Sequence, residues 1–308
     1  MEVKGLTLMK VLVTGACGFI GYELVRALEK LGYDVTAFVH RESKRPSSYF
    51  KGPVIVGDIR NLSDLERVGR VDCIHHFAAH SDPVDFGIDM METNVIGTSN
   101  ILEIARKNRS KVIFISSSAI YGNLPGPYRE DGETQPLNAY ASTKATAEYF
   151  CRAYVQEHHL DCIILRYFNT YGEGEEIKEK DASMVSHFIQ SILNTDSVEI
   201  YGDGKQQRDF IYVKDAIQAN ILAMNARGLS GKVFNVGTGK TTSYNELVGI
   251  IRKKLKREIA VRHVDNPIKA FYQLNTQADL SQTAAKLNFK THYSLEQGIE
   301  EVIKHYNR

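Results

Sequence analysis

The sequence KVLVTGACGFIG, at residues 10–21, decides the fold of this 308-residue chain. Its first five residues predict a buried strand, and residues 19–31 carry apolar side chains at helical spacing, which predicts a helix. Between them glycine recurs at every third position, at Gly15, Gly18 and Gly21. Glycine lets a backbone turn tightly beside a ligand, and a helix N-terminus attracts phosphate. We predict a turn that holds a dinucleotide pyrophosphate, with Phe19 and Ile20 beginning the helix; the alternative is a purely structural turn.

The alternation of strand and helix continues through the first half of the chain. Short apolar runs predict further strands at residues 34–39, 54–56, 71–77, 111–116 and 161–166. Helical patterns lie between them near residues 88–107 and 139–157. Strands that are apolar on both faces and alternate with helices form parallel sheets covered on both sides. We therefore predict an α/β fold with a doubly wound parallel sheet of the Rossmann type.

The pattern changes after about residue 170. A charged, glycine-containing loop at residues 172–181 precedes a predicted helix at 183–193, and shorter elements lead to a terminal helix near 295–306. We expect a smaller C-terminal α/β lobe laid over the carboxyl edge of the sheet. The expected division is a dinucleotide-binding domain at residues 1–170, with segments near 208–240 returning to it, and a mainly substrate-binding lobe at residues 171–308.

The bulk composition argues against several function classes. A formal net charge of +1 gives no support for nucleic-acid or membrane-surface binding. No stretch approaches the roughly 20 apolar residues that a membrane span needs, and the start of the chain lacks the apolar core of a signal peptide. The cysteines show neither paired nor metal-like spacing: Cys17, Cys73, Cys151 and Cys162. We expect a protein of the reducing cytoplasm that holds no metal.

The end of the second predicted strand bears on the choice of cofactor. An NAD-binding site often has an acidic residue there, whereas this chain has Val39 followed by His40, Arg41 and, shortly after, Lys44. A carboxylate would repel a 2′-phosphate, and an arginine would pair with it. We predict NADP rather than NAD, with His40 and Arg41 at the cofactor. The alternative is that residues 40–45 form a solvated loop.

Two further strand ends are predicted to contact the cofactor. Asp58 could accept a hydrogen bond from the adenine amino group while Ile59 covers the ring, although an aspartate here also serves as a turn or helix cap. The fourth strand closes with Phe77, Ala78 and Ala79, whose small members permit a close approach to the cofactor. Plain packing would explain these residues equally well.

The clearest chemistry belongs to Tyr140 and Lys144, which lie four positions apart and so project from one face of a helix. A lysine ammonium near a phenol favours the phenolate and lowers the pKa of the tyrosine. Tyr140 could then take a proton from an alcohol or return it to a ketone, while Lys144 holds the ribose hydroxyls of a nicotinamide nucleotide. The serines at residues 116–118 end a buried strand, where a hydroxyl could share the reacting oxygen with Tyr140.

Together these motifs resemble the extended short-chain dehydrogenase/reductase family of nucleotide-sugar epimerases, dehydratases and reductases, over essentially the whole chain. The matching segments are TGACGFIG (14–21), FAA (77–79), SSSAIYG (116–122), YASTK (140–144), RYFNTYG (166–172), RDFIYVKD (208–215) and FNVGTG (234–239). The resemblance implies that Ser117 acts in catalysis with Tyr140 and Lys144. It also implies ligand contacts: Tyr167 with the cofactor, and Ser118, Asn169, Arg208 and Tyr272 with the nucleotide sugar.

Within the family, the sequence favours an epimerase. Sugar dehydratases of this family use acidic residues after the catalytic hydroxyl residue, and this chain has Ser118 and Ala119 there. Residues 166–183 and 272–280 are similar to ADP-glycero-manno-heptose 6-epimerases and place Lys178 on that group's second catalytic acid/base residue, with nearby Lys180 as its rival. The acidic residue expected in that group after the glycine turn is missing, which keeps UDP-hexose 4-epimerases as the competing assignment.

The expected reaction is transient oxidation of a sugar carbon to a ketone, followed by return of hydride to the other face. A net ketoreductase or dehydrogenase would share the same residues but would consume cofactor stoichiometrically. A non-catalytic cofactor-binding regulator would be expected to lack the Tyr/Lys pair, which this chain retains. In the resembling family the helices near residues 88–107 and 139–157 form the dimer face, so we expect a homodimer.

Overall fold

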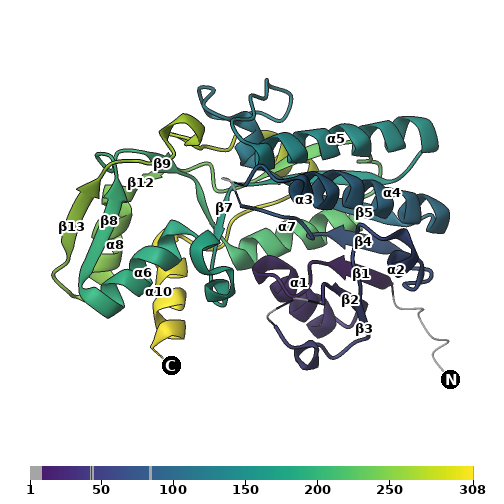
Figure 1. Cartoon of the computed structure of the whole chain (residues 1–308), viewed down its shortest axis with the longest axis horizontal. Helices are drawn as coiled ribbons and strands as arrows, with labels where there is room; N and C mark the ends of the chain where they lie inside the picture. Colours follow the sequence, from purple (N-terminus) through teal and green to yellow (C-terminus); the bar gives the residue numbers. More distant parts are fainter. Residues whose placement is uncertain (1–8, 42, 44, 83–84, 308) are drawn as a thin grey trace.

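The computed structural model describes residues 9–41, 43, 45–82 and 85–307. Its centre is a seven-stranded sheet in which all neighbouring strands are parallel (Figure 1). In spatial order its strands are β11 (Val233–Val236), β6 (Cys162–Tyr167), β5 (Lys111–Ser117), β4 (Cys73–His76), β1 (Lys10–Thr14), β2 (Asp34–Val39) and β3 (Val54–Val56). The predicted doubly wound parallel sheet is confirmed, and its strand order reverses at β1, which lies between β2 and β4.

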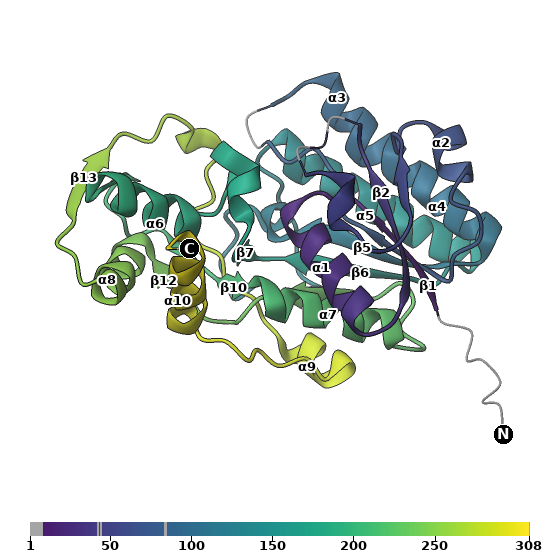
Figure 2. The ribbon, with the colours of Figure 1, turned by 90° about the horizontal axis from the view of Figure 1, so that it is seen from below.

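Helices cover both faces of this sheet (Figures 1 and 2). One face carries α1 (Phe19–Lys30) and α7 (Val213–Asn225), and the other carries α2 (Leu62–Glu66), α4 (Gly97–Asn108) and α5 (Ala139–His158). Side chains of β1 alternate between these two layers, because successive residues of a strand point to opposite faces. Val11 and Val13 pack in the cluster of α1 and α7, whereas Leu12 packs with α4 and α5.

The helix predicted near residues 88–107 is interrupted by one wide turn. It consists of α3 (Ile88–Met91), the π-helical segment η2 (Glu92–Ile96) and α4. Inside η2 the buried Asn94 side chain bonds the backbone N–H and C=O of His80, both at 2.8 Å. This turn therefore fixes the segment that leaves β4, next to the carboxyl edge of the sheet.

The smaller lobe is built mainly from later segments. Its elements are α6 (Met184–Thr195), β8 (Ser197–Tyr201), α8 (Tyr244–Leu255), β13 (Ala260–Val264) and α10 (Leu295–Tyr306), with the short pairs β7 (Asn169–Tyr171)/β10 (Phe210–Tyr212) and β9 (Gln207–Arg208)/β12 (Thr242–Ser243). The remaining elements are α9 (Ser281–Leu287) and the short helices η1 (Ser47–Tyr49), η3 (Ser118–Tyr121), η4 (Glu175–Asp181) and η5 (Lys269–Phe271). β11 joins the large sheet and α7 packs against it, although both follow α6 and β8 in the chain.

Among the residues that the structure describes, no helix is both long enough and apolar enough to cross a bilayer.

Candidate active site

The candidate active site is an open cleft at the carboxyl ends of the central strands, with about 1350 Å³ of empty space. It lies where the strand order reverses, which is where α/β sheets of this type bind ligands. Segments that follow β1, β4, β5 and β6 line it, together with α5 and η4 (Glu175–Asp181). The predicted site residues on its wall are Gly15, Gly18, Phe19, Ile20, Gly21, Phe77, Ala79, Ser117, Tyr140, Lys144, Tyr167, Asn169 and Lys178. Residues far apart in the sequence therefore meet in one cleft.

Glycine is required at two positions of the turn between β1 and α1. Gly15 has a φ of +65°, and a Cβ there would lie 2.7 Å from the backbone nitrogen of Ala78. A Cβ on Gly21 would lie 2.4 Å from the carbonyl oxygen of Gly15. Gly18 caps α1 without a side-chain hydrogen bond, which leaves the first N–H groups of the helix available to a ligand. A crowded glycine turn before such a helix end fits a dinucleotide pyrophosphate.

The residues predicted at the adenosine end lie beside this cleft rather than on its wall. His40 and Arg41 are exposed at the end of β2. Asp58 accepts hydrogen bonds from Arg60, and this guanidinium holds the pKa of the Asp58 carboxyl below its usual value. Ile59 is buried and packs against the backbone of Gly97. Asp58 thus already has a cationic partner, and Ile59 is a core residue whichever ligand lies beside it.

Arg45 is a cation beside the glycine turn that the sequence pattern did not single out. Its Nη1 donates to the carbonyl oxygens of Cys17 and Gly18, both at 3.2 Å. Its guanidinium lies 3.8 Å from the ring centroid of Tyr22, and burial lowers the pKa of Arg45. The only signal in the sequence was its membership of a basic loop after the second strand. Lys44, named with that loop, lies outside the described residues.

Ser117 and Tyr140 meet at the centre of the cleft. Ser117 is the last residue of β5, and its side chain hydrogen-bonds the Tyr140 phenol. Asn138 caps α5 by accepting a hydrogen bond from the backbone N–H of Ala141 at 2.8 Å. This cap fixes the start of α5 and places Tyr140 in its first turn, facing the end of the strand.

Lys144 lies one turn further along α5 and is almost fully buried. Its Nζ donates to the carbonyl oxygen of Ile115 at 2.8 Å, and burial lowers the pKa of Lys144 to about 8. Burial raises the pKa of Tyr140, and the hydrogen bond from Ser117 opposes that rise only in part. The lowering of the tyrosine pKa expected from the spacing is therefore not found. The reason is that the ammonium binds a strand carbonyl, while desolvation penalises the phenolate.

A second hollow, with about 1730 Å³ of empty space, continues the cleft into the smaller lobe and shares Tyr140 and Lys178 with it. Tyr272, predicted at the substrate, lies on its wall. Arg208 is buried behind this wall, with its guanidinium 5.1 Å from the Tyr272 ring centroid and 5.5 Å from that of Tyr244. It donates to three backbone carbonyl oxygens, of residues 207, 273 and 274. In this arrangement Arg208 supports the aromatic wall rather than facing the hollow.

The two other predicted substrate residues differ in placement. Asn169 lines the cleft, and its amide donates to the carbonyl oxygen of Asp209 at 3.1 Å and to Oγ1 of Thr276 at 3.0 Å. Ser118 is buried, is not on the wall, and accepts a hydrogen bond at its carbonyl from Gln273. Only Asn169 of this pair is placed to meet a ligand.

Lys178 projects from η4 into both hollows. Its Nζ lies 3.3 Å from Oε1 of Glu175, whose fully buried carboxylate also accepts from Ser183 N–H at 2.8 Å and Ser186 Oγ at 2.8 Å. Glu175 therefore ties the start of α6 to η4 and holds Lys178 near Tyr140. The side chain of Lys180 lies outside the described residues.

The chain matches the NAD dependent epimerase/dehydratase family over residues 11–237. It belongs to this family, as the sequence motifs predicted. It is 34% identical to a putative UDP-glucose 4-epimerase of Methanocaldococcus jannaschii, over 95% of this chain and 97% of the relative. It is 33% identical to a UDP-N-acetyl-alpha-D-glucosaminuronate decarboxylase of Bacillus cytotoxicus, over 95% and 96%.

Solved structures show the same relationship. The ADP-L-glycero-D-manno-heptose-6-epimerase of Helicobacter pylori has a TM-score of 0.88 and 35% identity, over 97% of this chain and 96% of that one. A tyrosine-to-phenylalanine mutant of a Bacillus cereus UDP-glucuronic acid 4-epimerase, solved with NAD and UDP-4-deoxy-4-fluoro-glucuronic acid, has a TM-score of 0.87 and 29% identity, over 97% and 99%. The prediction of an enzyme of the nucleotide-sugar epimerase group is confirmed by these relatives.

Proposed function

We propose that this protein inverts one carbon of a nucleotide-diphosphate sugar by transient oxidation to a keto-sugar and return of hydride. The observation that carries the proposal is the shared cleft: a glycine turn at one end, Ser117 and Tyr140 at its centre, and a second hollow continuing into the smaller lobe. The nicotinamide group, when bound, would accept and return the hydride. We expect a dinucleotide and a nucleotide sugar to lie end to end in this continuous cleft.

The roles of the central residues follow from their contacts. Tyr140 takes the proton of the sugar hydroxyl as the carbon is oxidised and returns it on reduction. Ser117 shares that oxygen, because its hydroxyl already bonds the phenol. Lys144 is the buried cation nearest this pair on α5 and would hold the ribose hydroxyls of the nicotinamide nucleotide. Asn169 and Tyr272 would contact the substrate from the wall of the cleft.

Lys178 is our candidate for a second acid/base group. The proposal is supported by its place in both hollows beside Tyr140, and by the similarity to the heptose 6-epimerase of Helicobacter pylori. The ion pair with Glu175 would keep the lysine side chain directed into the cleft. A UDP-hexose 4-epimerase, the competing assignment, would not need this amine.

For the cofactor we propose NADP, with NAD as the alternative. The proposal is supported by the exposed Arg41 at the end of β2 and by Arg45 beside the glycine turn, both of which could pair with a 2′-phosphate. The Bacillus cereus relative was solved with NAD, which is the argument for the alternative.

The four cysteines are free, which supports a reducing compartment such as the cytoplasm.

We also propose a homodimer formed through α3, α4 and α5. The support is a set of large apolar side chains that are more than a third exposed on or beside these helices: Phe86, Ile88, Met91, Ile96, Tyr149 and Phe150. Apolar side chains gathered on neighbouring helices are typical of a buried contact between subunits.

We propose that residues 1–170 and the returning segments near 208–240 bind the cofactor, and that the rest of the chain mainly binds the substrate.

The test is to incubate the purified protein with UDP-glucose, UDP-N-acetylglucosamine, UDP-glucuronate and ADP-glycero-manno-heptose, and to analyse products by chromatography and mass. An epimer of unchanged mass, with cofactor carried by the protein and released on denaturation, is the expected result. Stoichiometric consumption of added cofactor would instead identify a net reductase or dehydrogenase. Loss of carbon dioxide from a uronate would identify a decarboxylase, the activity in the name of the Bacillus cytotoxicus relative.

A further inference from the structure

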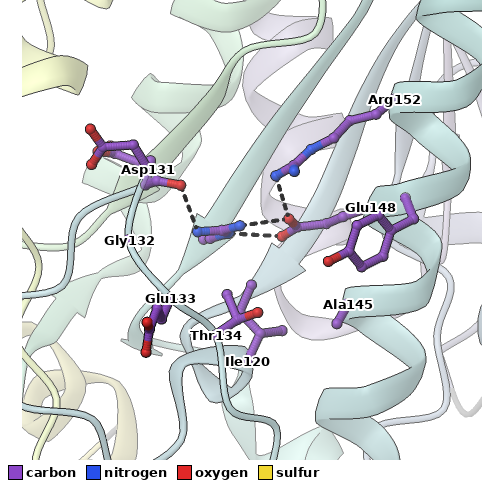
Figure 3. Close-up of a pocket in the computed structure, with 11 residues that line it drawn as sticks. Ile120, Asp131, Gly132, Glu133, Thr134, Ala145, Glu148 and Arg152 are labelled. Atoms are coloured by element: carbon purple, nitrogen blue, oxygen red, sulfur yellow. Dashed lines mark hydrogen bonds and ion pairs between the residues drawn. The ribbon is translucent and has the colours of Figure 1, made fainter.

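A separate hollow, with about 820 Å³ of empty space, opens between α5 and the segment at residues 130–134, away from the cleft wall (Figure 3). Its floor is an ion pair between Glu148 of α5 and Arg166 of β6, whose side chains are 4% and 2% exposed. Arg152, on the next turn of α5, lies 3.4 Å from the same carboxylate (Figure 3). The proposed mechanism gives none of these charges a role.

Each carboxylate oxygen of Glu148 and each guanidinium nitrogen of Arg166 has at least one hydrogen-bond partner. The Glu148 carboxylate accepts from Arg166 Nε at 2.9 Å, from Arg166 Nη2 at 2.7 Å and from Ser116 Oγ at 2.6 Å. Arg166 Nη1 donates to the Tyr121 hydroxyl at 2.8 Å and to the Glu130 carbonyl oxygen at 3.2 Å. These atoms are therefore held mainly by protein partners rather than presented to a ligand in this hollow. The role of the pair must lie in the segments that it joins.

Those segments are the two that carry the proposed catalytic residues. Along α5, Tyr140, Lys144 and Glu148 recur every four residues and so form one stripe. Each member of the stripe bonds one of three consecutive residues of β5. Lys144 donates to the Ile115 carbonyl, Glu148 accepts from Ser116, and Tyr140 bonds Ser117. Glu148 therefore fixes Ser116, the residue directly before Ser117, and Arg166 of β6 holds Glu148 in place.

Buried ion pairs add little net stability, because removing two charges from water offsets their attraction. What a bidentate pair does supply is a fixed geometry. We propose that Glu148 is a positioning residue, which with Arg166 and Ser116 holds the end of β5 against α5 at the spacing that Ser117 and Tyr140 need. The proposal rests on the function proposed for Ser117 and Tyr140.

The test compares three variants with the parent holoenzyme. Glu148→Gln/Arg166→Met removes both charges together, so no lone buried charge remains. Ser116→Ala removes only the link to the strand. Arg152→Gln, which changes a partly exposed arginine at the rim, is the control. The measurements are the melting temperature, kcat and KM with the nucleotide sugar that the parent converts, and the pKa of the Tyr140 phenol. The last is read from ultraviolet difference absorbance against the same variant carrying Tyr140→Phe.

For the double variant we expect a melting temperature near that of the parent, a kcat lower by about 30-fold and a KM within about 3-fold, because misplacement of a reacting group acts on turnover. The pKa of the phenol should rise, since the Ser117 hydrogen bond that opposes the rise is lost. Ser116→Ala should show the same pattern with a kcat loss of about 5-fold, and the control should match the parent. The other charged or titratable groups lining the cleft and second hollow stay constant throughout: Lys144, Tyr167, Lys178, Asp181, His187, Glu199, Tyr201, Tyr244 and Tyr272.

A double variant with parental kcat and an unshifted phenol pKa would overturn the proposal, as would a loss confined to the melting temperature. If the double variant does not fold, Ser116→Ala decides alone by the same two criteria. If the parent converts no nucleotide sugar, the proposed function fails, and the phenol titration still shows whether Glu148 and Ser116 position Tyr140.

Discussion

The two ends of the cleft are built in different ways. At the cofactor end a single stretch, residues 10–21, supplies the strand, the turn and the helix start, and its glycines pack against each other and against Ala78. At the substrate end the wall comes from η4, α6, β8, α8 and the segment around Tyr272, which are distant in sequence. The first end depends on local backbone shape. The second depends on side chains that bind the backbone of remote segments.

Asp209 illustrates the second kind of construction. Its fully buried carboxylate accepts hydrogen bonds from Thr238 N–H at 2.8 Å, Gly239 N–H at 2.9 Å and Ala278 N–H at 3.0 Å. One side chain therefore holds two remote loops together. Cofactor binding should be sensitive to single changes in the glycine turn, whereas substrate selectivity should be sensitive to contacts such as these.

The largest effect is expected where the two ends meet. Tyr140→Phe removes only the oxygen that transfers the proton, so kcat should fall by about 1000-fold or more while carried cofactor stays near the parent amount. Tyr149→Phe is the matched control, because this tyrosine is on the same helix but is exposed. Turnover and cofactor content after denaturation are the measurements. A kcat within a few-fold of the parent would remove Tyr140 from the mechanism.

A second test disrupts cofactor binding at the glycine turn alone. Gly15→Ala places a Cβ 2.7 Å from Ala78 at a positive φ, so we expect loss of nearly all carried cofactor and a lower melting temperature. Gly69→Ala has almost the same φ, +67°, with nothing within 4 Å of the added Cβ. In this control, backbone strain alone should lower the free energy of unfolding by about 1 kcal/mol, and the variant should keep its cofactor. Equal cofactor loss in both variants would contradict the close-approach argument.

The same difference explains how much of the site could be predicted from sequence. The glycine turn and the Tyr/Lys spacing are short patterns whose geometry follows from strand, turn and helix, and the structure places them in one cleft. The burial of Arg208 behind two tyrosines depends on residues 207, 273 and 274 meeting, which no local pattern encodes. The raised pKa of Tyr140 was missed for a related reason, since desolvation depends on the whole fold.

A third test sharpens the assignment of the substrate end. If Lys178 is the second acid/base group, Lys178→Gln should lower kcat by about 100-fold and leave the carried cofactor unchanged. Lys205→Gln is the control, because Lys205 is 81% exposed and away from both hollows. An unaffected kcat in Lys178→Gln would favour a 4-epimerase in which Tyr140 serves alone.

A fourth test concerns the adenosine edge of the cofactor end. Arg41→Ala should weaken NADP binding by about 10-fold and NAD binding little, because the lost guanidinium would pair only with the 2′-phosphate. Arg45→Ala should add to this loss if its guanidinium, now beside the Gly18 carbonyl, also pairs with the phosphate. Fluorescence titration with each reduced cofactor gives the two affinities. If both variants lose affinity for NADP and NAD equally, these arginines stabilise the loop and do not pair with the 2′-phosphate.

The smallest expected effect is a difference in pH dependence between cofactor binding and substrate binding. Burial lowers the pKa of Lys144 to about 8, so the ammonium form predominates below that pH and is lost as pH rises through it. Because the ammonium would hold the nicotinamide ribose, carried cofactor should fall by a few-fold above about pH 8, whereas substrate affinity, set in the second hollow, should stay constant. The measurement is cofactor retention after gel filtration at each pH, alongside KM. Lys144→Met should abolish the pH dependence of retention and give a constant low value, and a pH dependence that persists in this variant would assign the titration to another group.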